Sequence, residues 1–325
     1  GKVTLNSVED TYAKIQDIKL IADGEVDMGA AAVKVSDNVT KTEVDDLRTD
    51  TTGNITLTSL TEDKGDLATI NGFTDVILST ANITVTDNVD KSEADTIDAY
   101  SDTSGTVTLT SITDTVSNIT AVNTNANISI ASAAVTVTDA ASFDDADAIN
   151  GFTTGKVTLN SVEDTYAKIQ DIKLIADGEV DMGAAAVKVS DNVTKTEVDD
   201  LRTDTTGNIT LTSLTEDKGD LATINGFTDV ILSTANITVT DNVDKSEADT
   251  IDAYSDTSGT VTLTSITDTV SNVTAVENNA NISLDTSTIT VTDAASFDNA
   301  DAINGFTTGK VTLNSVEDTY AKIQD

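Results

Sequence analysis

The chain has 325 residues, with 56 Asp and Glu against 18 Lys and Arg, and a formal net charge of -38. This charge repels phosphate backbones and anionic lipid, so we predict no nucleic-acid partner. Because Cys and His are absent, the chain has no disulfide, no Cys or His ligand for zinc, haem or iron–sulfur clusters, and no thiol or imidazole catalyst. No run of about 18 apolar residues occurs, so we expect no membrane insertion.

The segment GKVTLNSVEDTYAKIQD occurs at 1–17, 155–171 and 309–325, which defines a period of 154 residues. We therefore divide the chain into copy 1 (1–154), copy 2 (155–308) and the start of a third copy (309–325). The two full copies differ at ten positions, all between Ile119 and Asp145 in the numbering of copy 1. Because the sequence begins and ends within a unit, we interpret it as an excerpt from a longer array.

Each copy is predicted to contain three modules of about 51 residues. A module begins with an alternating strand that ends in Asp; these strands are expected at 33–37, 83–87, 135–139, 187–191, 237–241 and 289–293. A second alternating strand follows 22 to 24 residues later, as at 157–161, 209–213 and 261–265. A third, short strand is expected at 180–182, 230–232 and 282–284. A period of this size indicates stacked supersecondary units.

The connections between these strands have apolar residues at every third position, as in Phe143, Ala146, Ile149 and Phe152. This spacing predicts short helices that lay one narrow apolar edge on the strands. Capping-box patterns mark their starts, at Ser142, Thr194 and Asp244, each with an acid three residues later. We expect Gly151, Gly207 and Gly259 to end helices before the second strand.

A five-residue strand with a short helix cannot bury its apolar face alone, so successive modules must stack. The predicted fold is a β-solenoid-like repeat protein, with parallel strands stacked in ladders and short flanking helical segments. The alternative is a series of tandem bacterial immunoglobulin-like β-sandwiches, which are antiparallel and contain little helix.

Two carboxylates recur in every module, one closing the first strand and one eight residues later. Stacking would align them in columns, and oxygen ligands of this kind bind calcium. The other interpretation is that the first Asp bonds its own backbone in a turn and the second lies on a solvated helix face. The calcium candidates are Asp37, Asp45, Asp87, Asp95, Asp139, Asp147, Asp191, Asp199, Asp241, Asp249, Asp293 and Asp301.

Two other interpretations concern the strand surface and catalysis. Thr-x-Thr pairs on the polar strand face are compatible with ice binding, although Lys34 and Lys188 interrupt the Thr column. Arg48 and Arg202 are the only arginines and occupy equivalent positions in the two copies. A catalytic site duplicated along an array is not expected, so we predict that the chain is not an enzyme.

The run VTVTDAASFDDADAINGFTTGKVTLNSVEDTYAKIQDI at 135–172 resembles the tandem repeats of large secreted bacterial surface proteins, namely giant adhesins, surface-layer proteins and extracellular filament subunits. The resemblance implies an extracellular or cell-surface location and stabilisation by calcium. We predict a structural protein that forms a stiff, acidic rod, filament or surface layer, with copies of itself as partners. The alternative is an adhesin repeat region that binds a surface ligand.

Overall fold

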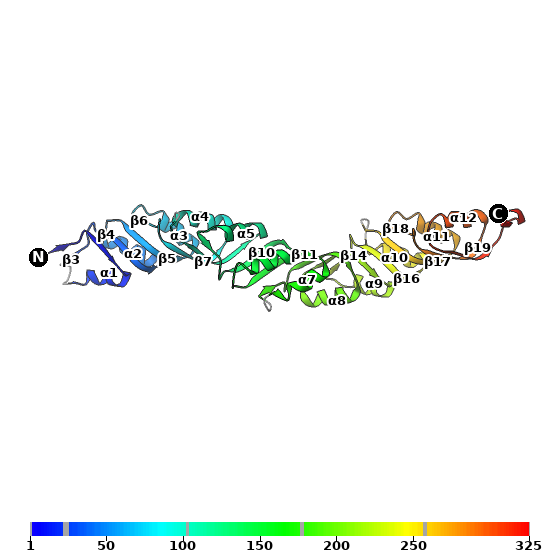
Figure 1. Ribbon diagram of the computed structural model, residues 1–325, viewed down its shortest axis with the longest axis horizontal. Helices are drawn as coiled ribbons and strands as arrows, with labels where there is room; N and C mark the ends of the chain where they lie inside the picture. The colour runs from blue at the N-terminus through cyan, green and yellow to red at the C-terminus, as the bar shows by residue number, and fades with distance from the viewer. Residues whose placement is uncertain (1, 22–25, 102–103, 176–178, 256–258, 325) are drawn as a thin grey trace. The chain divides into compact units, whose positions relative to one another are not determined.

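Long parallel strands alternate with short helices throughout the computed structural model, which describes residues 2–21, 26–101, 104–175, 179–255 and 259–324 (Figure 1). The chain divides into two compact units. The first comprises 1–160 with 172–181, and the second comprises 161–171 with 182–325. The same pattern of elements recurs in each unit.

Each module contains three kinds of strand, as the sequence predicts. The first strands are β4 (Ala32–Val39), β7 (Asn82–Val89), β10 (Ala134–Ala141), β13 (Ala186–Val193), β16 (Asn236–Val243) and β19 (Thr288–Ala295). The second strands are β5 (Ile55–Glu62), β8 (Val107–Asp114), β11 (Val157–Asp164), β14 (Ile209–Glu216), β17 (Val261–Asp268) and β20 (Val311–Val316), with β1 (Val3–Thr4) and β2 (Ser7–Asp10) in the equivalent place at the start. The short strands are β3 (Val26–Asp27), β6 (Val76–Ile77), β9 (Ile128–Ser129), β12 (Val180–Asp181), β15 (Val230–Ile231) and β18 (Ile282–Ser283).

A helix follows every long strand, and we call one long strand with the helix after it a rung. First helices, which follow first strands, are α2 (Lys41–Asp50), α4 (Lys91–Ser101), α6 (Phe143–Asn150), α8 (Lys195–Asp204), α10 (Lys245–Asp252) and α12 (Phe297–Asn304). Second helices, which follow second strands, are α1 (Tyr12–Lys19), α3 (Lys64–Asn71), α5 (Val116–Thr124), α7 (Tyr166–Ile172), α9 (Lys218–Asn225), α11 (Val270–Glu277) and α13 (Tyr320–Gln324). None of the helices among the described residues is long and apolar enough to cross a membrane.

The strands pair in parallel in both units, which supports a solenoid-like ladder and disagrees with antiparallel sandwiches. In unit 1, β5 pairs with β4 along one edge. Along its other edge, the first half of β5 pairs with the short strand β6 and the second half pairs with β7. In unit 2, β14 pairs in the same way with β13, β15 and β16.

The long strands extend three residues beyond the predicted five. In β4 the register shifts between Val35 and Asn38, which marks a β-bulge, and pairing resumes with Asn38 opposite Ser59 and Val39 opposite Leu60. The alternation of apolar and polar residues is broken at the bulge, so the sequence pattern did not reveal the continuation.

One face of the sheet carries the apolar core. Val33, Val35 and Val39 of β4 are at most 1% exposed, whereas Lys34 between them is exposed. The helices that cover this core pack side by side in chain order, as α2 to α5 do in unit 1. Buried Val44 and Leu47 of α2 show how each helix contributes its narrow apolar edge. The opposite face of the strands carries mostly Thr, Ser and Asn.

The glycines before the second strands have a role that differs from the prediction. Gly151 does end α6, but with a right-handed φ of -67°. Gly207 and Gly259 lie where two rungs approach: a Cβ there would be 2.1 Å from the carbonyl oxygen of Ala185 and 2.0 Å from that of Ala235. These two positions therefore require glycine because the backbones nearly touch, and not because the chain needs a left-handed turn.

Candidate functional site

The Asp that was predicted to close each first strand lies two residues before the end of that strand and caps a helix in the preceding rung. The Oδ1 atom of Asp37 accepts a hydrogen bond from the backbone N–H of Tyr12, the first residue of α1, at 2.8 Å. The same bond joins Asp87 to Lys64, Asp139 to Val116, Asp191 to Tyr166, Asp241 to Lys218 and Asp293 to Val270, at 2.8–3.0 Å. All six first Asp residues of the calcium prediction therefore satisfy a helix N-terminus that is distant in sequence.

Acidic residues at the ends of second strands cap first helices in the same direction. Asp114 accepts the backbone N–H of Lys91 at 2.8 Å, and Asp268 accepts that of Lys245 at 2.9 Å. Equivalent bonds join Glu62 to Lys41, Glu216 to Lys195 and Asp318 to Phe297. A negative charge at a helix N-terminus also interacts favourably with the helix dipole. The starts of α1–α5 and α7–α12 are thus completed by the rung that follows.

Most helices carry a second, local cap as well. The predicted capping boxes are confirmed at Ser142, Thr194 and Asp244. In α9, Asp217 accepts the backbone N–H of Asp220 at 2.9 Å, while Asp241 of the next rung serves Lys218. The local cap and the cap from the next rung therefore satisfy different backbone donors.

The second set of predicted calcium ligands lies on the outer face of the first helices. Four of them form ion pairs with the lysine four residues earlier, at 2.5–2.6 Å: Lys41–Asp45, Lys91–Asp95, Lys195–Asp199 and Lys245–Asp249. The other two, Asp147 and Asp301, are exposed. Exposed pairs of this spacing contribute only about 0.3–0.5 kcal/mol each to stability.

Within the described parts of the chain, no three His, Cys, Asp or Glu side chains are grouped so that they could hold a metal ion. The two Asp sets are also separated by function, since one binds helix N-termini and the other mostly binds lysines. Calcium binding by these residues stays a prediction that only solution measurements can test.

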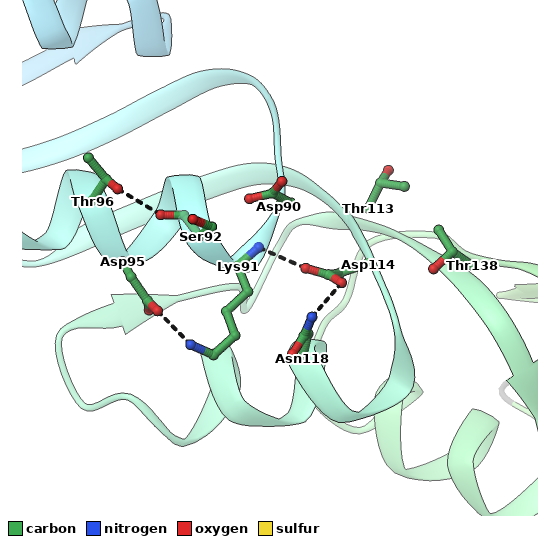
Figure 2. Close-up of a pocket in the computed structure, with 9 residues that line it drawn as sticks. All are labelled: Asp90, Lys91, Ser92, Asp95, Thr96, Thr113, Asp114, Asn118 and Thr138. Atoms are coloured by element: carbon green, nitrogen blue, oxygen red, sulfur yellow. Dashed lines mark hydrogen bonds and ion pairs between the residues drawn. The ribbon is translucent and has the colours of Figure 1, made fainter.

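A polar groove in unit 1, with a volume of about 710 Å³, lies where α4 and α5 begin (Figure 2). Its lining consists of Asp90, Lys91, Ser92, Asp95, Thr96, Thr113, Asp114, Asn118 and Thr138. Asp114 is central: it accepts the N–H of Lys91 and the side-chain amide of Asn118, both at 2.8 Å. Burial raises the pKa of Asp114, but its hydrogen bonds from Lys91, Asn118 and Thr115 outweigh burial and hold the pKa below the usual value.

On the exposed strand face, threonines stand in rows across neighbouring strands. Thr61, Thr84 and Thr108 are directly opposite one another in β5, β7 and β8. Lys34, which interrupts this pattern in β4, stands opposite Glu9 of β2 and forms an ion pair with it at 2.6 Å. The lysine is thus one half of a cross-strand pair, and the alternation within β4 alone does not reveal its partner.

The arginines and two of the tyrosines connect neighbouring rungs. The Nε atom of Arg48 lies 2.9 Å from Asp75, and the guanidinium centre lies 3.7 Å from the centroid of the Phe73 ring. The Tyr12 hydroxyl donates to Asp46 of the next helix at 2.9 Å. Burial, this hydrogen bond and nearby carboxylates raise the pKa of Tyr12 to about 12. Arg202 and Tyr166 repeat these contacts in unit 2.

Comparison of the chain with protein-family models, curated proteins and solved structures finds no match.

Proposed function

We propose that this chain is a structural repeat region, in which near-identical modules stack into a stiff, acidic spacer at a cell surface or in an extracellular matrix. Its activity is mechanical, and it carries out no catalysis. Its partners are further copies of the same repeat, in the form of a rod, filament or layer.

The observation that carries this proposal is the capping of helix N-termini by the rung that follows, as in the Asp37–Tyr12 and Asp241–Lys218 bonds. A rung taken alone leaves the first N–H of its helix without its carboxylate partner, and leaves one edge of its strand unpaired. Both costs disappear when the next rung is added, so stability depends on the interfaces between rungs. Coupling of this kind resists bending at each interface, which is the property a spacer needs.

The engaged side chains favour a structural function over ligand binding or catalysis. In the groove of unit 1, Asp114 and Asn118 bond to each other, and Lys91 bonds to Asp95 at 2.5 Å. The two arginines, which could bind an anionic substrate, are paired with Asp75 and Asp229. A ligand would have to compete with these internal contacts.

The exposed strand face likewise favours a structural function over ice binding. The Thr58 and Thr110 hydroxyls donate to the carbonyls of Val35 and Val85 at the β-bulges, at 2.8 and 2.9 Å. Thr61 donates to Asn38 at 2.9 Å. These hydroxyls stabilise the bulges and are therefore not free to form a regular water-binding array.

The high negative charge fits a long extracellular polymer. At -38 per 325 residues, neighbouring molecules repel one another at low salt, which favours solubility, and lateral packing requires counter-cations. Calcium would be an effective counter-cation for exposed carboxylates such as Asp147 and Asp301. We propose this calcium role as secondary to the direct contacts between rungs.

The test is to lengthen the chain by one or two further copies of 155–308 and to measure molecular length by electron microscopy and X-ray scattering. A stiff stack predicts that length increases by the same amount with each added copy. A flexible string of separate globules predicts that the mean end-to-end distance increases only as about the square root of copy number. The second result would contradict the proposed function.

A further inference from the structure

Two positions in each module change their residue from one module to the next, although the backbone contacts around them repeat. The first is the eighth residue of the first helix, which is Arg48 in α2, Asp98 in α4 and Asn150 in α6. The second is the first residue of the second helix, which is Tyr12, Lys64 and Val116 in successive modules and again Tyr166, Lys218 and Val270. Both positions repeat at 154 residues and not at 51.

In the first two modules of each copy, the eighth residue binds a matching residue in the segment just before the next short strand; Asn150, in the third, has its Oδ1 buried without a hydrogen-bond partner among the described residues. In the first module, Arg48 Nε lies 3.1 and 2.9 Å from the two carboxylate oxygens of Asp75. In the next module, Asp98 Oδ2 accepts the side-chain amide of Asn125 at 3.0 Å. Copy 2 repeats both, with Arg202 on Asp229 and Asp252 on Asn279 at 2.9 Å.

Where the first residue of the second helix is Tyr or Lys, its side chain also has a module-specific partner on the following helix. Tyr166 donates its hydroxyl to Asp200 at 3.0 Å. Lys218, in the equivalent position one module later, forms an ion pair with Glu247 at 2.8 Å. The side chains that bind neighbouring rungs therefore differ between interfaces that share one backbone geometry.

These pairs exclude one another when they are exchanged. Asp98 placed opposite Asp75 would bring two carboxylates together, and Arg48 placed opposite Asn125 would lose its counter-ion. Burial makes a wrong partner more costly at this position, because Oδ1 of Asp98 and Oδ1 of Asp252 are already buried without a hydrogen-bond partner among the described residues. Such like-charge contacts against wrong partners are a recognised source of specificity.

We propose that these module-specific pairs form a matching code that fixes which module stacks on which, so that only the whole 154-residue repeat is interchangeable. The proposal rests on the structural function above and deepens it, because it names the residues that specify the partner. Tandem arrays of similar units are prone to misassembly between neighbours. Distinct pairs at successive interfaces reduce that hazard without changing the backbone.

The test transfers one pair into the place of another in the full 325-residue chain. Arg48→Asp with Arg202→Asp puts a carboxylate opposite Asp75 and Asp229. Adding Asp75→Asn and Asp229→Asn then installs the Asp–Asn pair that occurs naturally at 98 and 125. Both copies are changed together because their sequences are identical in this region, so that peptides from the two copies report the same event.

The readout is amide hydrogen exchange at Ile55 and Ile209, whose N–H groups donate to the carbonyls of Asp75 and Asp229 at 2.7 Å. We expect the Arg→Asp pair of changes to accelerate exchange about tenfold, and the matched combination to return it to within about threefold of the parent chain. Exchange at Val107 and Val261, at the interface that is not altered, should stay constant.

A matched combination that exchanges as fast as Arg→Asp alone would overturn the proposal, because the arginine would then act only through its packing on Phe73 and Phe227. If the Arg→Asp chain does not fold, the reciprocal transfer gives the answer. Asp98→Arg and Asp252→Arg should destabilise alone and recover with Asn125→Asp and Asn279→Asp, and failure to recover would again overturn the code. The length per copy, measured on the matched variants, tests the spacer function separately. Recovery of slow exchange supports the matching code even if length does not increase evenly with copy number, and an even increase supports the spacer function even if exchange does not recover.

Discussion

Replacing Asp241 with Ala removes one contact between rungs and leaves the local helix cap in place. Asp241 accepts the Lys218 N–H at 3.0 Å, whereas Asp217 continues to cap Asp220. Loss of a capping acceptor costs about 1 kcal/mol. Loss of a charge near a helix N-terminus costs a further 0.3–1 kcal/mol or so. We therefore expect the free energy of unfolding to fall by about 1–2 kcal/mol, and Asp241→Asn, which keeps an acceptor but not the charge, to lose about half as much.

The measurement is the urea unfolding midpoint of the full chain, with Asp249→Ala as the matched control. Asp249 is an exposed Asp of the same module that only pairs with Lys245 on its own helix. Its removal should cost about 0.3–0.5 kcal/mol. If Asp241→Ala proves no more harmful than Asp249→Ala, the carboxylates at the strand ends do not couple the rungs, and the physical basis of the spacer proposal is wrong.

Three other measurements test separate features. Gly207→Ala should lower the free energy of unfolding by about 1–3 kcal/mol, and the thermal melting temperature with it, because its Cβ would meet a backbone carbonyl. The control is Gly219→Ala, whose Cβ would meet only the Asp217 side chain at 3.2 Å. This change should leave the melting temperature nearly unchanged. The pKa values of Asp114 and Asp268 are lowered in the folded chain. Their contribution to the free energy of unfolding is therefore complete above the ordinary carboxyl pKa of about 3.9 and is lost as the pH falls below it. Unfolding followed by circular dichroism should show constant stability from pH 7 to 5 and a loss of structure at lower pH. Calcium bound by the carboxylates predicts a lower melting temperature in excess chelator, and an unchanged melting curve would contradict the calcium proposal.

The fold was predictable from the sequence because its signals are local and repeated. Strict alternation in the first strands and threefold spacing in Phe143, Ala146 and Ile149 are period-2 and near-helical patterns that survive without tertiary information. The sequence predicts short strands at 180–182, 230–232 and 282–284, and the structure places β12, β15 and β18 within those ranges. The repeats strengthen these signals, because each kind of element recurs several times along the chain.

The contacts between rungs were not predictable from the sequence alone. Asp191 lies 25 residues from the Tyr166 N–H that it caps, and no local pattern connects two positions at that separation. The partner of Lys34 was missed for the same reason, because Glu9 becomes its neighbour only when the strand register is known. The β-bulge moves the alternation by one step, which hid the last two residues of β4, Asn38 and Val39.

The pairing of β5 has a consequence for a chain that has been cut. Residues 78–81 connect β6 to β7, and a protease that cleaves there leaves two new ends. Both ends remain hydrogen-bonded to the same uncut strand, since β6 pairs with the first half of β5 and β7 with the second half. β5 thus holds the two pieces together across the cut, and β8, β14 and β17 pair in the same way with the strands on both sides of their turns. A nicked molecule should therefore stay assembled until denaturant separates the pieces.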